Sequence, residues 1–254
     1  MIASESADPD VASAPVVGLA ELQLPGSVEC HRHRRHQLMY SIRGVMQVVT
    51  SLGRWVLPPS RAIWISGGTE HALLARRPVE LHILYVDPDH GQAPAWTDCA
   101  VLNVTPLVRE LVGASVCLPW DYPEDSAASR LTRVLLESLE ALPHAPVHLP
   151  EPRDTRGRKV ATAIRDAPGV RRSLAELAAI ATASPRTVER IFLNETGLSL
   201  SDWQTRSRLL AALERLADGE AVANVSDAVG YAHVSSFIAA FRGLFGTSPG
   251  RYFR

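Results

Sequence analysis

The chain has 254 residues, of which 46% are hydrophobic and 21% are charged, and its formal net charge is −1. This composition is typical of a folded protein with a buried core and excludes an intrinsically disordered chain. No apolar run approaches the roughly 20 residues that a membrane-spanning helix needs, and the acidic, polar opening differs from a signal peptide. We therefore expect a cytoplasmic protein with no membrane partner. Its three cysteines, Cys30, Cys99 and Cys117, are widely spaced, which favours free thiols over a disulfide framework.

The charge is distributed unevenly along the chain. Residues 155–254 contain 14 Arg or Lys and 9 Asp or Glu, a balance of +5, so the whole-chain totals of 26 and 27 leave 12 and 18 for residues 1–154, a balance of −6. A basic C-terminal segment joined to an acidic N-terminal one is typical of a nucleic-acid-binding module tethered to a module with another role.

The N-terminal part of the chain has the pattern of a β domain. Residues 1–15 are predicted to be a disordered N-terminus. Residues 16–104 contain short runs rich in Val, Ile, Leu, Trp and Tyr, separated by Gly and Pro. Several such runs at regular spacing predict a small β-barrel or sandwich.

Residues 105–142 have a helical pattern, with an apolar stripe at three-to-four-residue spacing formed by Leu131, Leu135, Leu139 and Leu142. The stripe is expected to pack either on the sheet of its own domain or on the matching helix of a second subunit, which would make a homodimer. Residues 143–155 are predicted to be an interdomain linker, because four prolines among residues 143–152 prevent a helix or a central strand.

Residues 156–254 form a helical region that begins with a helix-turn-helix pattern. Ser173 is placed to cap a short helix together with Glu176, and Ser184 followed by Pro185 predicts the start of a second helix. On that second helix one face is apolar, formed by Val188, Ile191 and Phe192. The opposite face is polar, as a helix that reads DNA requires.

The same pattern recurs about fifty residues later, which makes an internal structural repeat. Gly230 and Tyr231 occupy the predicted turn, and Phe237, Phe241 and Leu244 are predicted to face inward from the helix that follows. An amphipathic helix over residues 201–217 joins the two copies. Two reading helices that are rigidly joined can enter successive major grooves on one face of DNA.

The C-terminal motifs are specific. The run Ser-Pro-Arg-Thr-Val-Glu-Arg-Ile-Phe at 184–192, Gly-Leu-Ser-Leu-Ser-Asp-Trp at 197–203, and Phe-x3-Phe-Arg-x2-Phe-Gly-x-Ser-Pro-x2-Tyr at 237–252 closely resemble the AraC/XylS family of transcription regulators. Carried over by position, the resemblance implies DNA contacts by Arg186, Thr187, Glu189, Arg190, Ser235, Ser236 and Arg242. An arginine often found at the position of Ala239 is absent, so the second helix is expected mainly to contact phosphate.

Three histidines occur within six residues near the start of the β region. If this segment follows strand alternation, His31, His33 and Gln37 face one side and His36 faces the other. His71 follows a Gly-Gly turn farther along the chain. The side chains of the first set could therefore converge inside a barrel.

The segments 26–44 and 66–71 resemble the two cupin motifs, with Gln37 where metal-binding cupins usually carry Glu, and Ser66 in the usual place of Pro. The resemblance implies a cupin-type sensor that holds a divalent zinc, nickel, iron or manganese ion through His31, His33, Gln37 and His71. Two other interpretations remain open. The histidines could line a pocket for a small organic effector, or they could hydrogen-bond to one another.

Together these features predict an α+β protein with an N-terminal cupin-like β-barrel and an all-α double helix-turn-helix DNA-binding domain. We expect a sequence-specific transcription regulator, activator or repressor, that binds promoter or operator DNA and responds to a metal ion or small molecule. RNA polymerase is a further candidate partner. The alternative is a metal-dependent cupin enzyme with a helical tail that does not bind DNA. Since the barrel segment shows no paired carboxylates and no nucleophile triad, we do not expect an enzyme.

Overall fold

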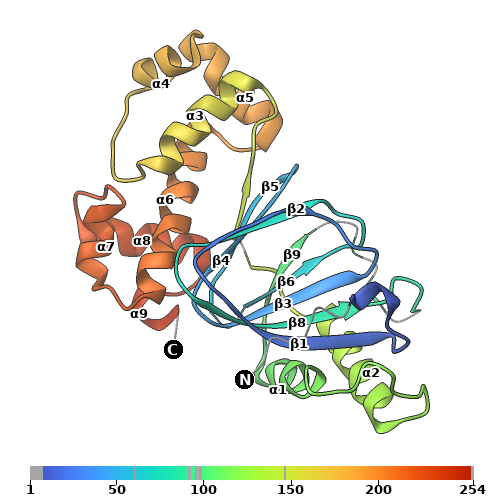
Figure 1. Ribbon diagram of the computed structural model, residues 1–254. Coiled ribbons are helices and arrows are strands. Elements are labelled where there is room, and N and C mark those ends of the chain that lie inside the picture. The colour runs from blue at the N-terminus through green and yellow to red at the C-terminus, as the bar shows by residue number, and fades with distance from the viewer. Residues whose placement is uncertain are drawn as a thin grey trace. The chain divides into compact units, whose positions relative to one another are not determined.

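The structure, a computed structural model, describes residues 8–59, 61–90, 93–94, 96, 99–145 and 147–252 (Figure 1). The chain divides into two compact units, one of residues 1–50 and 57–145 and the other of residues 51–56 and 146–254. Among the described residues, none of the helices combines the length and apolar character that crossing a bilayer requires.

The first unit is built on antiparallel strands. A five-stranded sheet has the order β1 (Val16–Gln23), β8 (Val79–Val86), β3 (His36–Arg43), β6 (Arg61–Ile65) and β9 (Ala100–Asn103). Strand β7 (His71–Ala75) pairs with both β2 (Gly26–His31) and β4 (Met46–Thr50) in a second sheet. The two sheets carry the N-terminal site described below.

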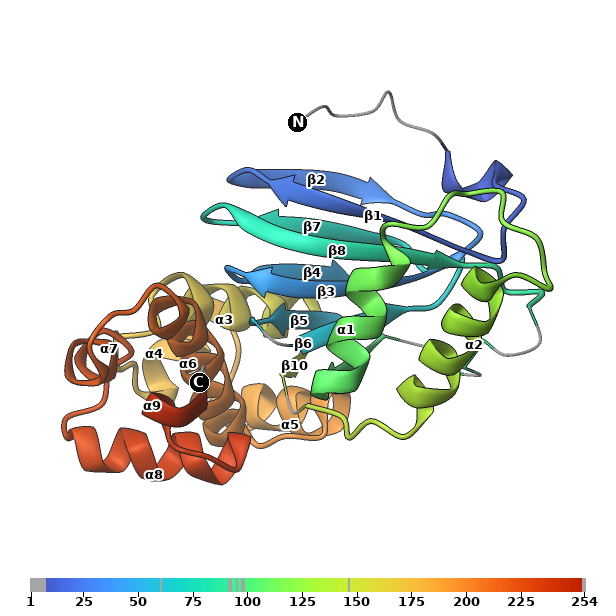
Figure 2. The ribbon, with the colours of Figure 1, turned by 90° about the horizontal axis from the view of Figure 1, so that it is seen from below.

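Helices α1 (Pro106–Ser115) and α2 (Ala127–Glu140) cover the β1-β8-β3-β6 sheet (Figure 2). The core between them contains Leu38, Trp64 and Leu84 from the strands. The predicted leucine stripe packs into this core, where Leu135 and Leu139 are fully buried. The sequence left two possible partners for this stripe, and the structure shows that it packs on the sheet of its own domain.

Residues 8–15 correct the prediction of a disordered N-terminus. They contain a short 3-10 helix, η1 (Pro9–Val11), and the carboxylate of Asp10 accepts hydrogen bonds from the backbone amides of Arg34 and Arg35 at 2.8 and 3.0 Å. The Arg35 side chain is only 1% exposed and donates to the carbonyl oxygen of Ala14 at 2.9 Å. This segment is ordered because a buried guanidinium needs acceptors and the backbone carbonyls supply them. Residues 1–7 of the predicted segment lie outside the described residues.

The second unit is helical apart from two short strands, β5 (Gly53–Leu57) and β10 (His148–Pro150), which pair with each other. All of β5 except Leu57 belongs to this unit. Its helices are α3 (Thr155–Asp166), α4 (Leu174–Ala181), α5 (Pro185–Thr196), α6 (Leu200–Ala217), α7 (Val222–Ala228), α8 (Val234–Phe245) and α9 (Pro249–Tyr252). The predicted fold class, an N-terminal β domain followed by an all-α helix-turn-helix domain, is confirmed.

Strand β10 lies inside the segment 143–155 that was predicted to be a linker. The carbonyl oxygen of Pro150 accepts a hydrogen bond from the indole nitrogen of Trp203 at 2.7 Å, and Leu149 is only 3% exposed. Residues 148–150 are therefore part of the second unit and not a free connection. The prolines still exclude a central strand, since β10 pairs with β5 at the end of the strand order.

Candidate functional site

Three histidines of the first unit form one cluster. His31 ends β2, His71 begins β7, and the two residues are paired across these strands. His33 follows in the loop after β2. One ligand atom of each ring lies within 4.8 Å of those of the other two. The ring centroid of His71 is 4.4 Å from that of His31 and 5.2 Å from that of His33.

Backbone carbonyls fix the orientation of all three rings. Each Nδ1 lies within hydrogen-bonding distance of a carbonyl oxygen two residues away, at 2.9 Å for His31, 2.6 Å for His33 and 3.0 Å for His71. Because a carbonyl oxygen only accepts, Nδ1 must carry the proton in each ring. A neutral ring then presents the lone pair of Nε2.

Burial keeps one ring of the cluster neutral. It lowers the pKa of His71 to about 4, since the charged imidazolium loses its hydration. The Nε2 atoms of His33 and His71 are buried, and no hydrogen-bond partner for them exists among the described residues. Such buried acceptors without a partner are rare, and an ion, a bound molecule or a water is the kind of group that satisfies them.

Gln37 and Tyr85 lie next to this cluster. The amide nitrogen of Gln37 donates to the Tyr85 hydroxyl at 3.1 Å, and the Tyr85 ring is 5.3 Å from the ring of His33. The amide oxygen of Gln37 is buried and also lacks a partner in the described part of the chain. Burial raises the pKa of Tyr85, so its hydroxyl stays protonated at neutral pH.

The other polar residues of this segment point elsewhere. Cys30 is exposed, and His36 stacks on Trp64 with ring centroids 5.0 Å apart while its Nδ1 accepts from the amide of Gly67. His36 therefore lies apart from the cluster, as predicted, although residues 32–35 form a loop through which strand alternation does not continue. Sequence reasoning missed Tyr85, because only the pairing of β3 with β8 brings it opposite Gln37.

The first helix-turn-helix consists of α4 and α5. Ser173 caps α4 and forms a complete capping box with Glu176, as predicted. Thr182 ends α4 in the left-handed conformation, with φ of 52°, and Ser184 caps α5 with Pro185 in its first turn. These local signals position α5 at a defined angle to α4.

The face of α5 that packs inward is apolar, and the opposite face is polar. Val188, Ile191 and Phe192 are buried. Thr187 is half-buried, and its hydroxyl is 2.9 Å from that of Ser184. The remaining residues that were predicted to contact DNA from this helix are exposed: Arg186, Glu189 and Arg190.

Helix α8 repeats this design in the second helix-turn-helix. Phe237 and Phe241 are fully buried, and Leu244 is half-buried. The residues predicted to contact DNA are all exposed: Ser235, Ser236 and Arg242.

The comparisons with known proteins agree with this arrangement. A family model described as a helix-turn-helix domain matches residues 177–254. The transcriptional regulator NimR of Escherichia coli is 31% identical over 222 residues, which cover 87% of this chain and 81% of NimR. The chain belongs to the AraC/XylS family of transcription regulators.

Two further proteins are similar over much of the chain. A Streptomyces lividans protein with an AraC-like description is 29% identical and covers 72% of this chain and 58% of its own length. A solved structure of ToxT from Vibrio cholerae has 10% identity and a TM-score of 0.41, covering 94% of this chain and 98% of that chain. As a member of the AraC/XylS family, the protein is a transcription regulator, and double-stranded DNA is its partner.

In this AraC/XylS protein the two helix-turn-helix units are held together through α6, which contacts α3, α5, α7 and α8. The loop between α3 and α4 also meets the turn between α7 and α8, since a Cβ atom on Gly230 would lie 2.8 Å from the carbonyl oxygen of Gly169. The Arg171 side chain donates to the Gly230 carbonyl at 2.9 Å, and Arg208 of α6 donates to the Pro168 carbonyl at 3.1 Å. These contacts favour a fixed spacing of α5 and α8, as two adjacent grooves demand.

Proposed function

We propose that the protein binds promoter or operator DNA sequence-specifically through α5 and α8, and that its N-terminal unit senses a divalent metal ion at the histidine cluster. Arg186, Thr187, Glu189, Arg190, Ser235, Ser236 and Arg242 are the proposed DNA contacts. The proposed ion ligands are His31, His33, Gln37 and His71. The protein acts in the cytoplasm as a homodimer and is not an enzyme.

The observation that carries the sensor proposal is the pair of buried, unpartnered Nε2 atoms beside a third imidazole. An unsatisfied buried polar atom costs about 1–3 kcal/mol, so two of them at one place need compensation. Metal-bound histidines typically donate their second ring nitrogen to a carbonyl or carboxylate, which is the arrangement of all three rings here. The residues therefore fit a divalent ion.

The chemistry of the ligand atoms narrows the choice of ion. Neutral imidazole nitrogens with one amide oxygen suit zinc, nickel, iron or manganese, whereas magnesium and calcium prefer sites made of oxygen. A bound ion would supply the positive charge that these neutral groups lack. The Gln37 hydrogen bond to Tyr85 would keep the amide oxygen free to face it.

The regulation follows from coupling between two sites. An ion that binds one conformation of the first unit more tightly shifts the population toward it, and DNA affinity then changes by the same coupling free energy. The homodimer is supported by exposed apolar side chains on the covering helices, with Leu107 of α1 60% exposed and Val134 of α2 46% exposed. RNA polymerase is the further proposed partner.

The enzymatic alternative lacks support from the groups around the cluster. Within the described residues, the candidate metal cluster consists of the three histidines, and no carboxylate belongs to it. Because all three imidazoles are proposed to bind the ion, none of them is left as the general acid or base that such chemistry usually needs near the reacting atoms. Turnover of an oxidisable substrate by the iron-loaded protein would establish the alternative.

Metal-binding titrations test the sensor proposal. Chelator-treated full-length protein is titrated with zinc, nickel, iron(II) and manganese in a calorimeter, alongside the double variant His33→Ala/His71→Ala and the control His90→Ala. Wild type and control should bind one ion per chain, and the double variant should lose binding. If wild type binds no ion, an organic effector replaces the metal in this proposal, and the same protein is then titrated with aromatic compounds.

A further inference from the structure

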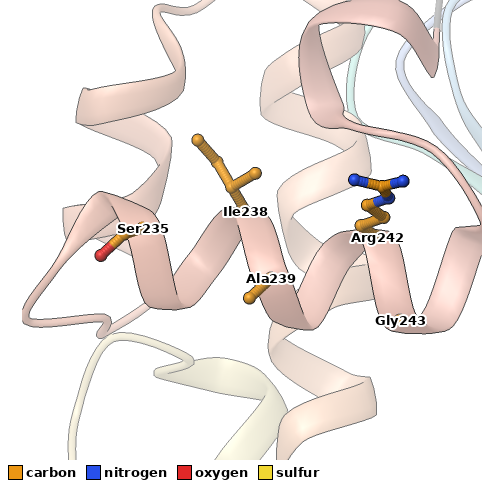
Figure 3. Close-up of a pocket in the computed structure, with 5 residues that line it drawn as sticks. All are labelled: Ser235, Ile238, Ala239, Arg242 and Gly243. Atoms are coloured by element: carbon orange, nitrogen blue, oxygen red, sulfur yellow. The ribbon is translucent and has the colours of Figure 1, made fainter.

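Helix α8 presents a stripe of exposed residues that differs from an ordinary polar face. Ser235, Ile238, Ala239 and Arg242 are all exposed, and their spacing places them on one side of the helix. Together with Gly243 they line a hollow on the surface (Figure 3). Ile238 and Arg242, one turn apart, project to the same side of α8 in this view.

The two reading helices can be aligned residue by residue. The buried residues Val188 and Phe192 of α5 match the buried Phe237 and Phe241 of α8. Each helix is also followed directly by a glycine with positive φ, which is 71° after α5 and 75° after α8. This alignment places Glu189 of α5 opposite Ile238 of α8.

The same alignment places Arg190 opposite Ala239, and Arg186 opposite Ser235. The central outward positions are therefore charged in α5 and apolar in α8. Helix α8 also contains no acidic residue, and its only charged side chain is Arg242. The two helices must read different features of DNA if both enter a groove.

The major groove offers one apolar group, the C5-methyl of thymine, while the other base edges present hydrogen-bond donors and acceptors. Isoleucine and alanine side chains cannot exchange hydrogen bonds with a base edge, but they can pack against a methyl group. Arg242, at the end of the same stripe, supplies the positive charge that a neighbouring phosphate attracts.

We propose that α8 recognises thymine methyl groups through Ile238 and Ala239, so that the half-site under α8 is defined by thymines. The half-site under α5 is defined by polar base edges, with Arg190 suited to guanine and Glu189 to the cytosine amino group. This inference rests on the proposed sequence-specific binding to DNA. It assigns base recognition to α8. Without it, α8 would be expected to contact only phosphate, because it has no arginine at position 239.

DNA is the occupant that the surroundings of the stripe favour. The stripe lies on the second helix of a helix-turn-helix, at positions that match the exposed, charged face of α5. For a protein partner, the stripe offers a contact surface of one helix face that also carries an arginine and a serine. The methyl group of a thymine, by contrast, can be contacted by two apolar side chains alone.

The test removes single chemical groups from the bases of the DNA. Preferred duplexes are first selected from a random library with the full-length protein, and the half-site of each helix is assigned by footprinting with an Arg190→Ala variant. Each thymine is then replaced by deoxyuridine, which lacks the methyl, and each guanine by 7-deazaguanine, which lacks the N7 acceptor. Affinities of wild type, Ile238→Ala and the control Ile180→Ala are measured at one salt concentration. Ile180 of α4 is 38% exposed, against 36% for Ile238, so the control matches residue type and exposure.

Removal of a contacted methyl group should weaken wild-type binding about fourfold, the value expected from one buried methyl or methylene. The effect should be confined to the half-site of α8, and 7-deazaguanine should act in the other half-site. Ile238→Ala should bind the thymine duplex more weakly and should no longer distinguish it from the deoxyuridine duplex, whereas Ile180→Ala should behave as wild type.

Three results would overturn the inference. Deoxyuridine could leave wild-type affinity unchanged at every position of the α8 half-site, Ile238→Ala could retain full discrimination, or selection could yield no preferred bases under α8, which would leave phosphate contacts alone. If selection yields no preferred sequence under either helix, the proposed sequence-specific function fails as well, so the two failures are distinguishable.

Discussion

Replacing Arg190 with alanine should weaken operator binding by about 1–3 kcal/mol, which is about 5- to 150-fold in affinity. The arginine is exposed on α5, and among the described residues it has neither an ion-pair partner nor a hydrogen-bond partner. Its backbone is held by the buried Val188 and Phe192, which the substitution leaves in place. The thermal stability of the free protein should therefore stay within the small range typical of surface substitutions, and the loss should appear only with DNA.

The assay is a fluorescence anisotropy titration of a labelled operator duplex over a series of salt concentrations. Loss of a phosphate contact should reduce the slope of log affinity against log salt by about one, whereas loss of a guanine contact should relax specificity at a single base pair. Arg133→Ala is the control, since Arg133 is an exposed arginine on α2 in the other unit. An unchanged affinity for Arg190→Ala, with the control also unchanged, would remove Arg190 from the interface and refute the assignment of α5.

Four further substitutions test the structure of the second unit. Gly230→Ala should destabilise the protein by about 1–3 kcal/mol in urea denaturation, because φ is 83° and the new Cβ would meet a backbone carbonyl at 2.8 Å. Gly219→Ala, with φ of 79° and open space around it, isolates the cost of the backbone conformation and should lose less. Trp203→Phe should lower stability by about 1 kcal/mol, because the partly buried carbonyl of Pro150 in β10 loses its donor. Asp154→Asn should flatten the pH dependence of stability as pH falls from about 4 to about 2, since the side-chain and backbone hydrogen bonds from Arg156 lower the pKa of Asp154 from 3.8 to about 2.

The sign of the Asp154 effect follows from that lowered pKa. The stability that its carboxylate contributes as the cap of α3 is present above the unfolded pKa of 3.8 and is lost as pH falls through about 2. Equal losses for Gly230→Ala and Gly219→Ala would show that the contact of Gly230 with the loop between α3 and α4 is unimportant. If Trp203→Phe is as stable as wild type, the hydrogen bond from Trp203 to β10 is unimportant for stability.

Local sequence signals predicted the parts of the second unit that depend on short-range chemistry. The capping box of Ser173 and Glu176, the cap of α5 at Ser184 and the buried faces of α5 and α8 were all confirmed. Each depends on residues within one or two helical turns, where spacing alone decides which side chains meet.

Features that depend on tertiary pairing could be predicted only in part. The sequence grouped His31, His33 and His71, and the structure brings them together by pairing β2 with β7 and through the loop after β2 that carries His33. Nothing local indicated Tyr85 as the partner of Gln37, since β8 pairs with β3 across more than forty residues of sequence.

Two other features depended on partners that periodicity cannot identify. The leucine stripe of α2 defined an apolar face but left open what that face would contact. The order of residues 8–15 comes from hydrogen bonds that Asp10 and Arg35 make across the fold, and the polar composition of the segment gave no sign of them.

The most direct test of the central claim is the affinity of the full-length protein for a selected operator, measured at one salt concentration with metal-free protein and again after addition of each divalent ion. The account predicts that the operator is preferred over random DNA by at least about 1,000-fold, and that one ion changes the operator affinity about 5- to 150-fold. The His33→Ala/His71→Ala variant should keep the preference and lose the response to the ion. A protein that binds the operator and random DNA equally, with or without metal, would contradict the account.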